Sequence, residues 1–203
     1  MVALRDMTSA QLARRAKIIE VVIDLIADVG ADAVQMRDVA QRSGVALATM
    51  YRYFSSKENL LAAALEDWQK RLTRRVLGSG GRPDGDPLPA VLDYLRRAQR
   101  AFYRNPEMTA LMLQMMASTD PEVKDIIDQM DRNNVEMFGR LLDGVAPEVI
   151  SNISFGLNTA LSGALVGLLA GRLTLEESLD HVEWVARVLL RAATPPCVIC
   201  PKV

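Results

Sequence analysis

The hydrophobic residues of this chain recur at the spacing of helices throughout. From residue 12 to residue 29 an apolar side chain returns every three or four positions, with Thr8 or Ser9 as the start signal and Gly30 as the stop. No segment alternates polar and apolar residues convincingly enough to be a strand, and no internal repeat is visible. The pattern therefore predicts an all-α protein of about nine helices.

Cap residues and prolines mark where the later helices begin. Ser55 and Glu58 have the spacing of a capping box, which predicts a helix that runs to about Val76. Proline favours the first turn of a helix, so prolines mark further helix starts. Thr174 and Glu177 have the spacing of a second capping box. These signals predict further helices at residues 88–104, 106–118, 121–143, 147–171 and 174–193.

A tight turn joins two short helices between residues 36 and 53. Gly44 supplies the turn, because glycine enters a left-handed backbone conformation without steric cost. Val39 and Ala40 of the first helix face the core, as do Val45 and Met50 of the second. This arrangement is typical of a helix-turn-helix DNA reader. The residues left on or near the outer face of the second helix are Leu47, Ala48, Thr49, Tyr51 and Tyr53.

At these positions the sequence resembles the TetR-type transcriptional regulators. The resemblance is densest between Ile18 and Ala64, and it departs from the common pattern at Gln35, Ala46 and Ala48. It implies a three-helix DNA-binding head with contacts from the second short helix and its surroundings. The matching residues are Val39, Ala40, Gly44, Val45, the run from Thr49 to Phe54, Lys57, Leu60 and Leu61.

Three cations around this turn are suited to contact with DNA. Arg37 can grip guanine in the major groove or a phosphate, although a solvated surface arginine has the same sequence signature. Lys57 begins the next helix, where its charge and the free amides of a helix N-terminus form a phosphate clamp. Arg52 fits a phosphate contact or an ion pair with Asp38. The expected DNA-binding residues are Gln35, Arg37, Leu47, Ala48, Thr49, Tyr51, Tyr53 and Lys57.

A glycine- and proline-rich segment divides the chain. GSGGRPDGDP at residues 78–87 is the clearest break. We expect a helix-turn-helix domain at 9–55 with a linking helix at 56–77, a ligand-binding and dimerisation domain at 87–194, and a tail at 195–203. One DNA-binding head reads only a few base pairs, so specific binding to operator DNA requires a homodimer. The domain at residues 87–194, the body of the protein, is expected to form the dimer.

The most apolar stretch of the chain runs from residue 153 to residue 171. Gly163, Gly167 and Gly171 follow at four-residue spacing, which suits a membrane helix pair or two soluble helices in close contact. Polar residues such as Asn158 and the lack of basic flanks favour the soluble interpretation, with no membrane partner. TetR-type regulators dimerise through their last two long helices, and the resemblance implies the same here. The expected interface residues are Gly163, Gly167, Leu175, Leu179, Val182, Val185 and Leu189.

Methionine is concentrated between Phe102 and Phe138, where six of the chain's ten methionines lie. Methionine fills irregular cavities and apolar binding surfaces, although an ordinary core uses it too. Together with nearby aromatic residues and two asparagines as polar anchors, the cluster predicts a pocket for an apolar small-molecule effector. The expected lining residues are Trp68, Phe102, Met108, Met112, Met115, Met116, Met130, Asn134, Met137, Phe138, Phe155 and Asn158.

Short strings also resemble the steroid-catabolism repressors within the TetR family. They are AVQMR at residues 33–37, YRYF with the following SK at residues 51–57, and RNP at residues 104–106. This second resemblance implies an effector that is a steroid or a steroid-derived acyl-CoA.

Charge and composition fit a protein that touches nucleic acid at one end. Residues 1–75 carry 12 Lys and Arg against 9 Asp and Glu, whereas residues 76–203 carry 12 against 16. The N-terminus lacks the basic-then-apolar run of a signal peptide, so we expect a cytoplasmic protein. Cys197 and Cys200 form a lone C-x-x-C, and with His181 as the only histidine no zinc site or other cofactor is expected.

The sequence therefore predicts a sequence-specific DNA-binding regulator of transcription. We expect a repressor that releases a palindromic operator when an apolar small molecule binds. No phosphate loop, zinc-protease motif or nucleophile motif occurs, so an enzyme is not expected. The alternative is an architectural DNA-binding protein without a ligand, which would have a solid core behind the methionines.

Overall fold

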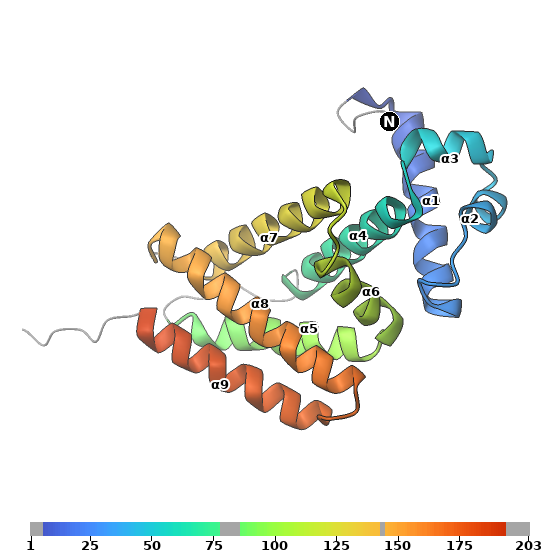
Figure 1. The fold of residues 1–203 in the computed structure, drawn as a ribbon. Helices are drawn as coiled ribbons and strands as arrows, with labels where there is room; N and C mark the ends of the chain where they lie inside the picture. The colour runs from blue at the N-terminus through green and yellow to red at the C-terminus, as the bar shows by residue number, and fades with distance from the viewer. Residues whose placement is uncertain (1–5, 78–85, 143–144, 194–203) are drawn as a thin grey trace, which may run out of the picture. The chain divides into compact units, whose positions relative to one another are not determined.

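The computed structural model describes residues 6–77, 86–142 and 145–193, and within these ranges the chain forms nine α-helices (Figure 1). The described residues contain no strand, which confirms the all-α prediction. Cys197 and Cys200 lie outside the described ranges. In chain order the helices are α1 (Ser9–Val29), α2 (Met36–Ser43), α3 (Leu47–Tyr53), α4 (Lys57–Leu77), α5 (Leu88–Tyr103), α6 (Pro106–Met116), α7 (Pro121–Leu141), α8 (Pro147–Leu169) and α9 (Leu175–Ala193).

The chain folds into two compact units. The first comprises Met1–Arg74 and Arg104–Met130, and the second comprises Arg75–Tyr103 and Asp131–Val203. The first unit includes α6 because that helix packs against α1. The expected division into a head at residues 9–55 and a body at residues 87–194 does not coincide with these units, and it stays a prediction.

In the first unit, α1 begins and ends at its predicted signals. The Gln11 backbone N–H donates to Thr8 Oγ1 at 3.3 Å, and the Thr8 backbone N–H donates to Gln11 Oε1 at 2.8 Å. These two bonds satisfy amides that have no partner within the helix. At the other end, the amide of Gly30 donates to the carbonyl of Ile26 at 2.9 Å. The buried face of α1 consists of Ile18, Ile19, Val22, Leu25 and Ile26.

The cap of α4 corrects the sequence prediction by one residue. Ser56, and not Ser55, accepts the capping hydrogen bond, which the amide of Asn59 donates to its hydroxyl oxygen at 3.0 Å. Both serines precede the helix, so sequence spacing alone does not separate them. The hydroxyl of Ser55 instead donates to the carboxylate of Glu122 in the first turn of α7. Ser55 is thereby tied to a segment 67 positions away in the chain.

In the second unit, α5, α8 and α9 pack together with the end of α7 around one hydrophobic core. Figure 1 shows α8 and α9 side by side along most of their length. The ring of Tyr94 meets the ring of Phe138 edge-on, with 5.7 Å between their centroids. The predicted box at the start of α9 is present, because Thr174 and Glu177 exchange backbone and side-chain hydrogen bonds at 2.8 and 3.2 Å.

Helix α8 is the one described helix that is long and apolar enough to cross a membrane. This criterion uses length and composition only, and the core helix of a soluble protein also satisfies it. Leu157 of α8 is fully buried in the core of the second unit, and 28% of the residues in the most apolar window of the helix are buried. Packing within the unit therefore accounts for part of the apolar composition of this helix, while Phe155, Val166 and Leu169 stay exposed.

Candidate nucleic-acid interface and subunit interface

The turn between α2 and α3 has the geometry that the sequence predicts. Gly44 adopts the left-handed conformation, with φ 69° and ψ 28°. The amide of Val45 donates to the carbonyl of Ala40 at 3.0 Å, which closes the turn. Val39, Ala40 and Met50 are buried, so they hold the two short helices against the unit's core. The turn therefore fixes the direction in which α3 presents its outer face.

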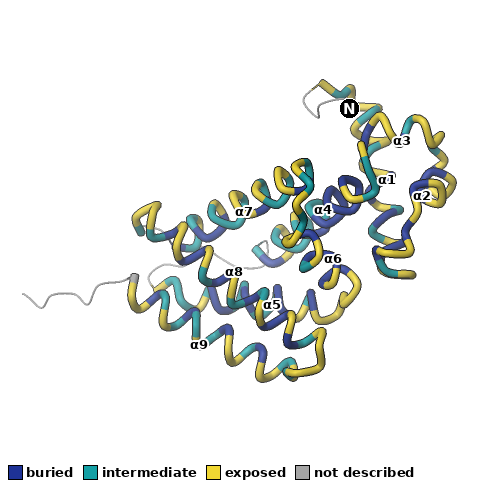
Figure 2. The backbone as a smooth tube through the Cα atoms, viewed as in Figure 1, coloured by how far each residue is buried: buried dark blue, intermediate teal, exposed yellow. Residues whose placement is uncertain are grey.

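Much of α3 is exposed to solvent, as is part of α2 (Figure 2). We define the head face as Gln35, Arg37, Leu47, Ala48, Thr49 and Tyr51, all exposed except the half-buried Thr49. Tyr51 is 50% exposed although it is a large aromatic residue. Guanidinium, amide and hydroxyl groups can hydrogen-bond to base edges and phosphates, and small apolar side chains can contact thymine methyl groups.

Tyr53 does not belong to this face. It is only 5% exposed, and its ring lies 6.5 Å from that of Phe54, centroid to centroid. Tyr53 follows Met50 by three positions, so the two residues lie on the same side of the helix. The sequence prediction that Tyr53 lies near the outer face is corrected by this placement.

The segment that follows α3 is fixed against α1. Phe54 is fully buried, and the guanidinium carbon of Arg15 lies 5.1 Å from the centroid of its ring. Burial lowers the pKa of Arg15, and the nearby charges of Glu66 and Asp67 partly offset that effect. The cation and the ring together hold the end of α3 to the first helix.

Lys57 lies at the start of α4, as predicted, but its ammonium already has a partner. Its Nζ donates to the carbonyl oxygen of Asp32 at 2.7 Å. An ammonium group has three donors, so this bond leaves capacity for a further acceptor. A phosphate contact by Lys57 stays a prediction.

The residues of the predicted ligand pocket are divided equally between the two compact units. Trp68 and the methionines from Met108 to Met130 belong to the first unit, and the other six residues belong to the second. Most are buried, but Met116 is 51% exposed and Phe155 is 75% exposed. Those two side chains do not have the burial expected of pocket lining. A common pocket for the remaining ten residues stays a prediction.

Two of the predicted interface residues are used within the chain itself. Val182 is 1% exposed and forms part of the core of the second unit. A Cβ atom on Gly167 would lie 2.5 Å from Cδ1 of Leu173, so the small size of Gly167 admits a side chain of its own protomer. Both residues are thus unavailable to a partner. Gly163 differs, because a Cβ atom there would meet nothing within 4 Å.

A different apolar surface lies open on the same two helices. We define the body face as Phe155, Gly163, Val166 and Leu169 of α8 with Trp184 and Val188 of α9. Trp184 is 67% exposed and Phe155 is 75% exposed. On α8, Gly163, Val166 and Leu169 follow at three-residue steps, and Phe155 lies about two turns earlier. On α9, Val188 follows Trp184 by four residues, so the members of each helix lie along one side of it. Large exposed apolar groups at such spacing mark an interaction surface.

Residues 18–64, which contain α2 and α3, match the bacterial regulatory proteins of the tetR family. The chain is 34% identical over 140 residues to the HTH-type transcriptional repressor KstR of Rhodococcus jostii, and this stretch is 69% of the chain and 65% of that repressor. It is 28% identical over 193 residues to the KstR repressor of Mycolicibacterium smegmatis, or 93% of each protein. The chain belongs to the TetR family.

Solved structures of TetR regulators share the fold. A TetR transcriptional regulator from Rhodococcus sp. RHA1 has a TM-score of 0.81 at 27% identity, covering 92% of this chain and all of the other. The regulator FadR from Bacillus subtilis, in complex with stearoyl-CoA, has a TM-score of 0.63 at 14% identity and covers 86% and 97% of the two chains. At this low sequence identity, the similarity to FadR shows only that the two chains share a fold.

Membership of the TetR family confirms the main prediction made from the sequence. TetR regulators bind operator DNA through a helix-turn-helix, act as dimers and respond to small-molecule effectors. The relatives and structural neighbours are regulators of transcription, so the assignment to a regulator rather than an enzyme is also confirmed.

Proposed function

We propose that this TetR-family protein is a homodimeric repressor that releases a palindromic operator when an apolar small molecule binds. The observation that carries the proposal is the head face, which presents Arg37 and Tyr51 to solvent on a turn held rigidly by buried neighbours. Direct readout needs such groups at the mouth of the major groove. The similarity to KstR repressors over most of the chain supports repression.

The body face supports the dimer. Two copies that meet there would cover Phe155 and Trp184, which the protomer leaves exposed. Gly163 lies within the face and has open space above it, so a second helix can approach closely. A symmetric pair places two head faces on two half-sites of a palindrome.

The effector is apolar and bulky in this proposal, a steroid or an acyl-CoA. Support comes from the buried methionines of α6 and α7 and from two relationships: the KstR repressors in sequence and the acyl-CoA-bound FadR in fold. Operator binding places the protein with the chromosome in the cytoplasm. An architectural DNA-binding protein without a ligand is the second candidate.

A mobility-shift assay on the protein's own upstream DNA tests the proposal. We expect a specific complex that resists random competitor DNA and that dissociates when the right steroid or acyl-CoA is added. Specific binding that no lipophilic compound releases would favour the architectural candidate. Equal binding to specific and random DNA would contradict a sequence-specific repressor.

A further inference from the structure

The first compact unit joins the helix-turn-helix to two segments from far along the chain. The helices α1 to α3 and most of α4 come from Met1–Arg74, whereas α6 and the first part of α7 come from Arg104–Met130. Contacts that α6 and α7 make with the earlier helices can therefore affect how α3 is presented to DNA.

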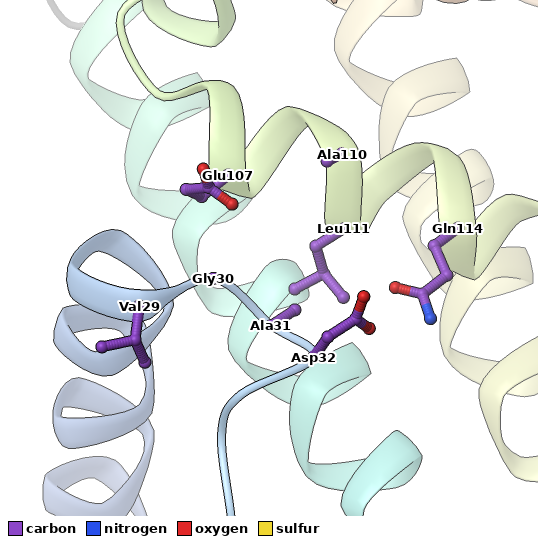
Figure 3. Close-up of a pocket in the computed structure, with 8 residues that line it drawn as sticks. All are labelled: Val29, Gly30, Ala31, Asp32, Glu107, Ala110, Leu111 and Gln114. Carbon is purple, nitrogen blue, oxygen red and sulfur yellow. The ribbon is translucent and has the colours of Figure 1, made fainter.

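Helix α6 meets the end of α1 without a directional bond (Figure 3). A Cβ atom on Gly30 would lie 2.9 Å from Oε2 of Glu107, so the two segments touch there. The same region leaves a cavity of about 200 Å³ between residues 29–32 and α6. Within the described ranges, no hydrogen bond or ion pair joins the side chains of Glu107 and Gln114 to residues 29–32. This contact is loosely packed.

Helix α7 makes a directional contact instead. The hydroxyl of Ser55 donates to the carboxylate of Glu122, 67 positions away in the chain. Ser55 lies between α3 and α4, and Glu122 lies in the first turn of α7. A hydrogen bond to an ionised acceptor is stronger than one between neutral groups. The bond therefore ties the junction of α3 and α4 to α7.

The junction around Ser55 is itself well held. Phe54, directly before it, is fully buried, and the amide of Phe54 donates to the carbonyl of Met50 in α3 at 3.0 Å. Ser56, directly after it, caps α4 through the amide of Asn59. Since both neighbours are fixed to helices, a bond to Ser55 acts on the end of α3.

The first turn of α7 is constrained as well. The carboxylate of Asp120 accepts hydrogen bonds from the amides of Glu122 and Val123, at 2.8 and 3.1 Å. An aspartate at this position satisfies amides that have no partner within the helix. Val123 is fully buried, which anchors the turn in the unit. The side chain of Glu122 thus reaches Ser55 from a fixed backbone.

We propose that Glu122 is a positioning residue for operator binding. Through its hydrogen bond with Ser55, it holds the α3–α4 junction, and with it the exposed face of α3, in the arrangement that fits the major groove. A protein that adopts this arrangement only part of the time binds more weakly in the same proportion. Glu122 acts through Ser55 rather than by touching DNA. The inference rests on the proposed operator binding and adds a residue outside the head face to it.

A double-mutant cycle on operator affinity tests the pair. Ser55→Ala and Glu122→Ala should each weaken binding about threefold to tenfold, as the loss of one hydrogen bond does. The double variant should bind as weakly as the single variants and no more weakly, because both remove the same bond. Glu122→Gln keeps an acceptor and should lose less than Glu122→Ala. Asp125→Ala, which removes an exposed carboxylate three residues further along α7, is the matched control and should not weaken binding.

Hydrogen exchange without DNA tests the physical basis separately. The amide of Phe54, which closes the end of α3, should exchange about threefold to tenfold faster in Ser55→Ala and in Glu122→Ala than in the wild type. The amide of Val22, buried in α1, should be unchanged. This measurement needs no operator, so a wild type that fails to bind DNA specifically would contradict the proposed function and leave this test standing.

Three results would overturn the positioning role. They are additive losses in the double variant, tighter operator binding by Glu122→Ala, and unchanged exchange of the Phe54 amide in both single variants. A loss of affinity in Ser55→Ala alone would make Ser55 a direct DNA contact and would also overturn it.

Discussion

The head face and the body face both leave large side chains exposed, yet their chemistry differs. The head face is formed by the short helices α2 and α3, and it combines Arg37 and Tyr51 with small residues. The body face extends along two long helices and consists of Phe155, Trp184 and aliphatic residues without a charge among them. A charged and hydroxylated face suits phosphates and base edges, whereas an uncharged aromatic face suits a protein partner. The exposure of a face does not indicate whether it binds DNA or protein. The chemistry of its exposed side chains does indicate this.

Charge separates the same two regions. Residues 1–75 carry a net charge of +3 and residues 76–203 carry −4. A modest positive charge near the head face favours approach to DNA, and the negative remainder disfavours contact with DNA elsewhere. The comparison leads to predictions that separate dimer contacts from DNA contacts.

The largest effect is expected at the body face. Trp184→Ala should weaken the dimer by about 4 kcal/mol, because a buried aromatic anchor contributes about 2 kcal/mol or more and a two-fold interface contains it twice. Analytical ultracentrifugation would measure the shift toward monomer. Tyr103→Ala is the control, since Tyr103 is 53% exposed in the second unit but lies on α5. Equal dimer affinity in both variants would move the interface away from the body face.

The two tyrosines of α3 distinguish packing from recognition. Tyr53→Ala should reduce the free energy of unfolding by about 3–5 kcal/mol, as the loss of a buried aromatic ring does. Tyr51→Ala should change stability by less than about 0.5 kcal/mol but weaken operator binding. Chemical denaturation and a DNA titration on each variant would measure the two quantities. If Tyr53→Ala proves as stable as Tyr51→Ala, the burial assigned to Tyr53 is wrong.

Within the head face, Arg37 is expected to read a base. Arg37→Ala should cost about 1–3 kcal/mol per half-site on the operator and relax the sequence preference at one position. Lys70→Ala provides a comparison, because Lys70 pairs with Glu66 at 2.6 Å on α4, outside the head face. Binding-site selection on random DNA would show the change in preference. A uniform loss on all sequences would make Arg37 a phosphate contact instead.

The smallest effect concerns a charged cluster between α5 and α9. Hydrogen bonds from Arg187, at 2.6 Å, and from Arg96 lower the pKa of Glu183. A lowered pKa adds stability that is complete above the ordinary glutamate pKa near 4.5 and is lost as the pH falls through the lowered value.

Glu183→Gln should therefore reduce stability at neutral pH by about 1 kcal/mol or less, and by progressively less below pH 4.5. Thermal unfolding at several pH values would measure this, with Glu136→Gln as an exposed control in the second unit. A difference from wild type that persists unchanged in acid would show that the carboxylate charge is not responsible.

Local signals predicted most of the fold, because they act between residues close in the chain. The cap at Thr8, the turn at Gly44 and the box at Thr174 all form as the sequence indicates. The burial of Tyr53 could also have been predicted from the sequence. Tyr53 follows Met50 by three residues, so both side chains lie on the same side of α3. The exchange of roles between Ser55 and Ser56 could not be predicted, since it depends on Glu122 approaching from a distant part of the chain.

The sequence alone does not identify the body face, for a similar reason. Helix α9 has apolar residues on more than one side, and Val182 and Trp184 are only two positions apart. Which side turns inward depends on where α5 and α8 lie. The structure buries Val182 in the core and leaves Trp184 67% exposed. Tertiary packing therefore determines which side of α9 is buried, and the hydrophobic pattern of the sequence does not.

The central claim is that two chains joined at the body face read one palindrome through two head faces. Sedimentation of the protein on a palindromic operator and on a single half-site, with wild type and Trp184→Ala, tests it most directly. The account predicts two wild-type chains per palindrome, weak binding to the half-site, and loss of the palindrome's advantage in Trp184→Ala. One chain per palindrome, or equal affinity for palindrome and half-site in the wild type, would contradict it.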